Sequence, residues 1–204
     1  MESIRKKSFL SVAFGLGICT MYASSLFSKN PEETIASVLT EEEAITNFAP
    51  PYAKHEFDDF KEALAFKESQ GNYLVVNKLG YLGKYQFGRT TLERFKIYDT
   101  NEFLKDPELQ EKAFLALCAV NKWILRKDIR RSVGKKINGI LITESGILAA
   151  AHLAGAGNVK KFLRSQGQNG FADAFGTTVA SYLELFAAYD TSDIVADRMP
   201  IVTV

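Results

Sequence analysis

The sequence predicts a mostly helical domain of the α+β class, with a small irregular or β lobe beside a helix that ends in a carboxylate. Several segments carry apolar residues at helical spacing. Residues 73–88 show no helical period and contain many glycines, which is typical of turns and short extended pieces. Apolar residues make up 47% of the 204-residue chain, which is ample for a packed core, and the length fits one domain with extensions.

Changes in composition predict the domain boundaries. Residues 26–55 contain serines, prolines and a run of glutamates, and we interpret them as a linker or tether. Apolar periodicity begins at Phe57, so the folded domain is expected over residues 56–190. A tail over residues 191–204 completes the chain.

The first 25 residues, 1–25, have the pattern of a signal peptide. Basic residues at 5–7 precede an apolar segment over 9–21, and small residues follow at 23–25. The apolar segment is too short and too mixed for a transmembrane helix of about 20 residues. We therefore expect cleavage and a periplasmic, cell-envelope or secreted protein without a stable membrane span, with an uncleaved anchor as the alternative.

Cys19 raises a lipoprotein alternative, because residues 16–19 partly resemble a lipobox. The bulky Ile18 departs from the small residue expected before the cysteine, so we do not expect lipidation. Without residues 1–25 the chain has 22 basic and 23 acidic residues, a balance that does not indicate a nucleic-acid partner. Cys118 is then the only cysteine, and its apolar helical surroundings predict a buried side chain rather than a disulfide.

Two helices are predicted in the first half of the domain. The first begins at Phe57 and has Glu68 at its end. The second is long, since Asp106 suits the N-cap and Pro107 suits the first helical position. Its apolar stripe consists of Leu109, Phe114, Leu117, Val120 and Ile124.

The last third of the chain predicts a series of shorter elements separated by turn residues. In chain order they are turns at Gly134 and Asn138-Gly139 around a short segment over 137–142, a helix over 146–153 capped by Thr143 or Ser145, a break at Gly155-Ala156-Gly157, a helix over 158–164 and a final helix over 179–188.

The sequence does not indicate a metal site or a cofactor. Two histidines and one mature cysteine are too few for a His/Cys metal site. His55 begins a pattern like that of zinc proteases, but Asp59 stands where the second histidine would be. We therefore expect neither a metal nor a cofactor.

Glu68 is the candidate catalytic residue, because a loop suited to sugar binding follows it. Glycines permit tight turns, aromatic rings stack on the CH faces of sugars, and side-chain amides pair with hydroxyl or acetamido groups. The residues of these three kinds are Gly71, Gly80, Gly83 and Gly88, then Tyr73, Tyr81, Tyr85 and Phe87, and finally Gln70, Asn72, Asn77 and Gln86. A proton-donating carboxyl beside such a surface is what glycosidic cleavage requires.

Three motifs in chain order carry a resemblance to a known family. They are Glu68-Ser69, Gly83-Lys84-Tyr85-Gln86-Phe87 and Ala150-Ala151-His152-Leu153-Ala154-Gly155. With them the chain resembles the lysozyme-like lytic transglycosylases that cleave bacterial peptidoglycan, over roughly residues 57–189. Residues 81–88 and 173–178 look like a subgroup carried by phages and bacteria.

The resemblance implies a lysozyme-like fold and a single-carboxylate mechanism. Glu68 would donate a proton to the β-1,4 glycosidic oxygen between N-acetylmuramic acid and N-acetylglucosamine. Its carboxylate would then deprotonate the muramic 6-hydroxyl, which closes a 1,6-anhydro ring. Ser69 would orient Glu68 or the substrate acetamide. Gln86 and Tyr85 would hold sugar on the opposite wall, and His152 would add a hydrogen bond.

Two alternatives to lytic transglycosylation remain open. A hydrolysing muramidase would use Asp173 or another acid to activate water. A non-catalytic envelope module would bind peptidoglycan without cleaving it, although the intact Glu68 argues against that. In all three cases the partner is the peptidoglycan glycan strand, and we expect a monomer.

Overall fold

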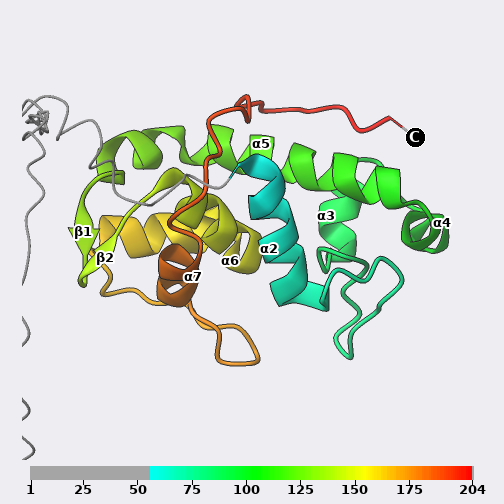
Figure 1. Cartoon of the computed structure of the whole chain (residues 1–204), viewed down its shortest axis with the longest axis horizontal. Helices are drawn as coiled ribbons and strands as arrows, with labels where there is room; N and C mark the ends of the chain where they lie inside the picture. Colours follow the sequence, from blue (N-terminus) through cyan, green and yellow to red (C-terminus); the bar gives the residue numbers. More distant parts are fainter. Residues whose placement is uncertain (1–55, 204) are drawn as a thin grey trace, which may run out of the picture. The chain divides into compact units, whose positions relative to one another are not determined.

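The computed structural model describes residues 56–203, which are mostly helical with one small antiparallel sheet (Figure 1). The elements are α2 (Phe57–Ser69), α3 (Arg89–Arg94), α4 (Thr100–Lys105), α5 (Pro107–Ser132), β1 (Lys136–Ile137), β2 (Ile140–Leu141), α6 (Glu144–Arg164) and α7 (Val179–Leu185). The predicted α+β class is confirmed. The predicted signal peptide and tether fall outside the described residues.

The long helix α5 is the element around which the others are arranged. It begins where the sequence predicted, because the Asp106 side chain accepts a hydrogen bond from the Leu109 backbone N–H and Pro107 occupies the first position. Helix α6 packs against both α5 and α7. The segment after α7 returns along α5, where the Asp197 N–H donates to the Ala119 carbonyl (Figure 1).

Helix α6 is capped by Thr143, whose hydroxyl accepts from the Gly146 N–H at 3.1 Å. The predicted break lies at Gly155, where φ is 76° and ψ is 149°, a conformation open to glycine. We predicted that the helix would resume at Asn158, but it resumes directly after Gly155. Helix α7 ends at Leu185, three residues before the predicted end.

The β1–β2 hairpin turns through Asn138 and Gly139, whose φ angles of 51° and 83° match the type I′ turn that such a pair favours. The sequence predicted the irregular lobe at residues 73–88, and that segment is indeed non-helical. It contains only isolated bridges, from Leu82 to Val76 and to Phe87. Helices α3 and α4 were not predicted, since six residues are too few to show a helical period.

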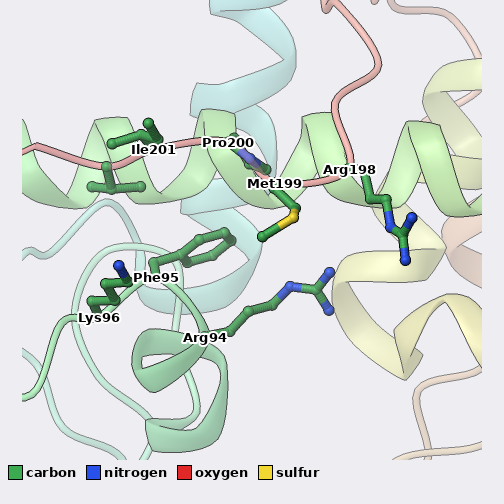
Figure 2. Close-up of a pocket in the computed structure, with 8 residues that line it drawn as sticks. Arg94, Phe95, Lys96, Arg198, Met199, Pro200 and Ile201 are labelled. Carbon is green, nitrogen blue, oxygen red and sulfur yellow. The ribbon is translucent and has the colours of Figure 1, made fainter.

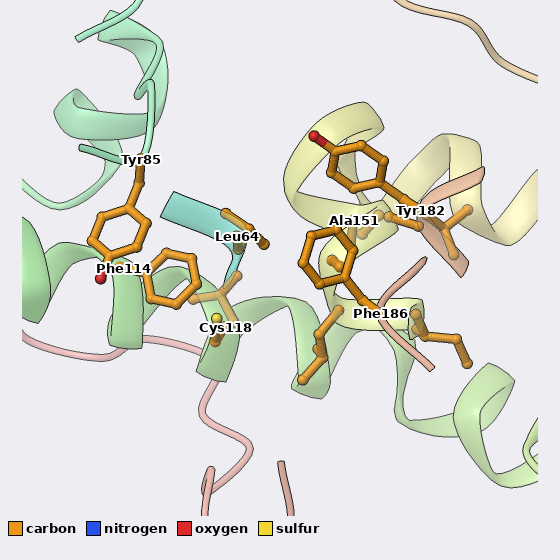
Figure 3. Packing of buried hydrophobic residues seen from close by; sticks show 14 of the residues in the cluster. Leu64, Tyr85, Phe114, Cys118, Ala151, Tyr182 and Phe186 are labelled. Carbon is orange, nitrogen blue, oxygen red and sulfur yellow. The ribbon is translucent and has the colours of Figure 1, made fainter. Parts of the chain in front are cut away.

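Aromatic side chains from separate elements meet in the core (Figure 3). The rings of Tyr85 and Phe114 stack with centroids 4.0 Å apart. Phe60 of α2 contacts Phe186 edge to face at 6.0 Å. Cys118 is buried beside this cluster, as predicted, and burial raises the pKa of its thiol.

A buried ion pair joins the 73–88 segment to α5. The Lys84 ammonium, whose side chain is only 5% exposed, lies 2.9 Å from Glu111 Oε1 and also pairs with Glu62. The hydroxyls of Tyr73 and Tyr85 each donate to Glu111 at 2.8 Å. These contacts give the glycine-rich segment a fixed inner face.

Glu111→Gln is expected to lower the free energy of unfolding at pH 7 by about 3 kcal/mol. The change replaces one of the two carboxylate partners of the buried Lys84 ammonium with a neutral amide. Burial by itself raises the pKa of Glu111. The hydrogen bonds from Lys84, Tyr85 and Tyr73 lower the pKa by more than burial raises it, so the pKa lies below the ordinary value. A depressed carboxyl pKa stabilises the fold above the unfolded pKa of about 4.3, and this stability is lost as the pH falls through the folded pKa.

Urea unfolding at pH 7 and pH 3 measures both effects, and the difference between wild type and Glu111→Gln should shrink at pH 3. The control is Glu108→Gln on the same helix, where the side chain is 78% exposed and pairs only with Lys112. It should change stability by about 0.5 kcal/mol or less. Equal losses in the two variants would contradict the role of the buried pair.

Gly146→Ala is expected to destabilise the protein by about 1–3 kcal/mol. A Cβ atom at Gly146 would lie 2.5 Å from the Leu183 backbone oxygen, so α6 and α7 would have to separate. Gly157→Ala is the matched control on the same helix, because nothing lies within 4 Å of its added Cβ. That change should stabilise by up to about 1 kcal/mol. Thermal midpoints of both variants test the contrast.

Candidate active site

Glu68 lies in the last turn of α2 and borders a hollow of about 400 Å³. The helix ends at Ser69, and its C-cap residue Gln70 adopts a left-handed conformation with φ 57°. The other walls come from distant parts of the chain: Gln86 from the glycine-rich segment, His152 from α6, Asp173 from the segment before α7, and Tyr182 from α7. Tyr81 also lines this hollow. Four of the other expected site residues therefore share it with Glu68, namely Tyr81, Gln86, His152 and Asp173.

Tyr182 is a residue of the candidate site that the sequence did not reveal. Its buried hydroxyl donates to Glu68 Oε1 at 2.8 Å, across 114 residues of chain. Burial and the negative charge of Glu68 raise the pKa of Tyr182, so the phenol stays protonated and remains a donor. The only available signal was its place on the apolar face of the predicted last helix.

Ser69 holds the end of α2 against the glycine-rich segment. Its hydroxyl donates to the Lys84 carbonyl at 2.7 Å and accepts from the Asn72 N–H at 3.0 Å. It does not line the hollow that Glu68 shares with Gln86 and His152, but it lines a separate one with Glu68 at the end of α2. The position expected for a substrate contact therefore carries a structural hydrogen bond.

His152 is placed by a backbone carbonyl. Its Nε2 lies 2.8 Å from the Tyr85 oxygen, and because a carbonyl can only accept, Nε2 carries the proton. Nδ1 is buried without a hydrogen-bond partner among residues 56–203. The ring nevertheless lines the hollow, so it closes this wall mainly by its shape.

Gln86 lines the same hollow as Glu68 and belongs to a tight turn. Its φ is 51°, and its side-chain amide nitrogen donates to the Gly83 carbonyl at 2.8 Å. One hydrogen of the amide nitrogen is thereby used within the turn. Among the described residues this side chain has no other hydrogen bond, so its amide oxygen and its second N–H are left for a ligand.

Asp173 is a second carboxylate on the same hollow. Its Oδ1 accepts from the Phe175 N–H at 2.9 Å and the Thr177 N–H at 2.7 Å, which shapes the turn before α7. Its negative charge also contributes to the raised pKa of Tyr182. The hollow therefore contains two acids, of which Glu68 alone is held by a side-chain donor.

Tyr73 and Tyr85 do not lie where the sequence predicted. Tyr85 is completely buried, and both hydroxyls bind Glu111 on the inner side of the segment. Neither residue lines the Glu68 hollow. The reason is the buried Lys84–Glu111 pair, which needs their hydroxyls as further hydrogen-bond donors. We correct Tyr85 from a sugar-binding to a structural residue because it is completely buried, whereas Tyr73 is partly exposed and its role in sugar binding stays a prediction.

A second hollow of about 510 Å³ adjoins the first. The two share Tyr81, Gln86 and His152 as lining residues, together with two leucines, so they are neighbours, and we refer to them together as the groove. Arg89 of α3 and Asn121 of α5 line the second hollow beyond this shared wall. Volumes of this order are typical of ligand pockets.

A further pocket lies between the end of α3 and the carboxyl-terminal segment (Figure 2). Arg94, Lys96 and Arg198 border it, with Phe95 and Met199 as apolar lining. No carboxylate is among its lining residues, so it holds no proton donor for glycosidic cleavage. The Glu68 groove, where an acid meets residues of the other two motifs, is the candidate active site.

Among residues 56–203 no group of three or more His, Cys, Asp or Glu side chains is arranged to hold a metal ion. No helix in that range combines the length and the apolar character needed to cross a membrane. Comparisons of the chain with protein-family models, with curated proteins and with solved structures found no match.

Proposed function

We propose that this chain is a lysozyme-like enzyme that cleaves the β-1,4 bond between N-acetylmuramic acid and N-acetylglucosamine in peptidoglycan, by lytic transglycosylation. The main support is that Glu68, Gln86 and His152 line one hollow. These residues come from the three separate motifs on which the sequence resemblance rests. Each motif could match by chance, but their convergence at one hollow around a carboxylate supports the proposal.

In the proposed reaction the protonated Glu68 donates its proton to the glycosidic oxygen, and the bond to the anomeric carbon of the muramic acid breaks. The Glu68 carboxylate then accepts the proton of the muramic 6-hydroxyl, whose oxygen bonds to the anomeric carbon. No water is consumed, and the product carries a 1,6-anhydro ring. Tyr182 holds Oε1 throughout, so Oε2, to which no described residue donates, is the oxygen that can face the substrate.

A hydrolysing muramidase is the second candidate, because Asp173 lines the same hollow as Glu68. There Asp173 would accept a proton from the attacking water, while Glu68 protonates the leaving oxygen. Mass spectrometry of digested peptidoglycan distinguishes the two reactions, since anhydro ends follow from transglycosylation and reducing ends from hydrolysis. A non-catalytic binding module would release neither product.

Glu68→Gln is expected to reduce cleavage of purified peptidoglycan by at least about 10²–10⁴-fold. Glutamine keeps the shape of the side chain and can still accept from Tyr182, but it cannot donate a proton as an acid. Release of soluble muropeptides measures the rate. Glu184→Gln on α7 is the control, because this exposed carboxylate lies outside the groove, and it should cleave at the wild-type rate. Near-normal turnover by Glu68→Gln would refute the assignment.

Tyr182→Phe is expected to lower kcat about tenfold while KM stays within about twofold, because one hydrogen bond that positions Glu68 is lost and the ring packing is kept. The ring contacts Phe186 with centroids 5.2 Å apart, and phenylalanine preserves that contact. A purely structural role would lower the thermal midpoint without this separation of kcat from KM. The exposed Tyr98→Phe serves as the control.

A further inference from the structure

Asn121 is a buried amide without a protein partner. Its side chain lies on α5 and is 5% exposed, and no hydrogen bond to it occurs among the described residues. Among the described residues the only fully buried side-chain polar atom without a partner is His152 Nδ1, so the amide atoms of Asn121 are accessible from the surface that they line. Because Asn121 lines the second hollow of the groove, the unused donor and acceptor groups are available to a ligand there.

Arg89 brings a positive charge to the same hollow. Its guanidinium makes one long contact, 3.4 Å to the Thr100 hydroxyl, and forms no ion pair within residues 56–203. No carboxylate lines this hollow, whereas Glu68 and Asp173 both line the first. The charge of the groove therefore changes from negative around Glu68 to positive around Arg89.

This polarity constrains the ligand. Since the two hollows share Tyr81, Gln86 and His152, a chain-like ligand that reaches Glu68 can continue to Asn121 and Arg89. Its part in the second hollow should carry an anionic group for Arg89 and an amide or hydroxyl for Asn121. A guanidinium favours carboxylates, with which it forms charge-assisted hydrogen bonds.

We propose that the second hollow selects carboxylate-bearing N-acetylated sugars, with Arg89 binding the carboxylate and Asn121 binding the acetamido group. This inference rests on the proposed function and adds a specificity determinant to it. The carboxylate could belong to the lactyl ether of muramic acid or to a peptide attached to it. Neutral chitin oligomers have the same acetamido groups but carry neither carboxylate, so they should depend on Asn121 and not on Arg89.

Binding measurements on the full chain with Glu68→Gln test this selection, because the inactive variant leaves the ligand intact. Three probes separate the sources of charge: a peptidoglycan tetrasaccharide with peptides, the same tetrasaccharide without peptides, and chitotetraose. Each is titrated calorimetrically against Arg89→Gln, Asn121→Ala and the control Arg94→Gln. Arg94 is matched to Arg89, since both are exposed cations on α3, but it lines the pocket of Figure 2.

Arg89→Gln should raise Kd for both carboxylate-bearing tetrasaccharides about five- to tenfold and leave chitotetraose within about twofold. An effect confined to the peptide-bearing probe would assign the carboxylate to the peptide. Asn121→Ala should weaken all three probes alike, and Arg94→Gln should weaken none. Thermal midpoints confirm that each variant is folded.

An equal change for all three probes with Arg89→Gln, or no change at all, would overturn the selection. If wild type still releases muropeptides in that case, the proposed function stands and only this inference fails. If no probe binds and wild type releases nothing, both fail.

Discussion

The buried pair between Lys84 and Glu111 is the contact on which the candidate site depends. An ammonium with so little exposure is stable only when hydrogen-bonded acceptors surround it, and the Glu111 carboxylate is shared with Tyr73 and Tyr85 for this purpose. Residues 73–88 lack a helical period and could adopt many conformations on their own. Their contacts with Glu111 hold Tyr73, Tyr85 and Lys84 on the side of the segment that faces α5. The remaining side chains are left for the other side, and Gln86 is one of those that line the groove.

The same segment also aligns the other two walls through consecutive backbone carbonyls. The Lys84 oxygen accepts from Ser69, directly after Glu68, and the Tyr85 oxygen accepts from His152 on α6. The Glu68-Ser69 motif and the motif that contains His152 are thus both hydrogen-bonded to the motif over residues 83–87. This explains why a hydroxyl follows the carboxylate and why a polar ring stands in the third motif, without assigning either one a chemical step. The motifs preserve the geometry of the groove, and Glu68 is its candidate acid.

Elements with strong local signals could be predicted from the sequence, and contacts across the chain could not. Asp106 and Thr143 mark helix starts because capping depends on residues three apart. The inward tyrosines are indistinguishable in sequence from outward Tyr81, since their direction is set by Glu111, which lies 26 residues from Tyr85. The Tyr182–Glu68 bond spans most of the domain and left no local pattern at all.

The close approach of the glycine-rich segment to α5 explains one glycine in physical terms. Gly83 has φ 73°, and a Cβ there would clash with the side chain of Gln110. Gln110 is itself fully buried, accepts from the Lys84 N–H, and donates to the Phe103 carbonyl, so it cannot move aside without losing those bonds. The Gly83 carbonyl in turn accepts from both the backbone and the side chain of Gln86. The position of the groove wall around Gln86 therefore depends on α5 through Gly83, where a side chain would clash with Gln110.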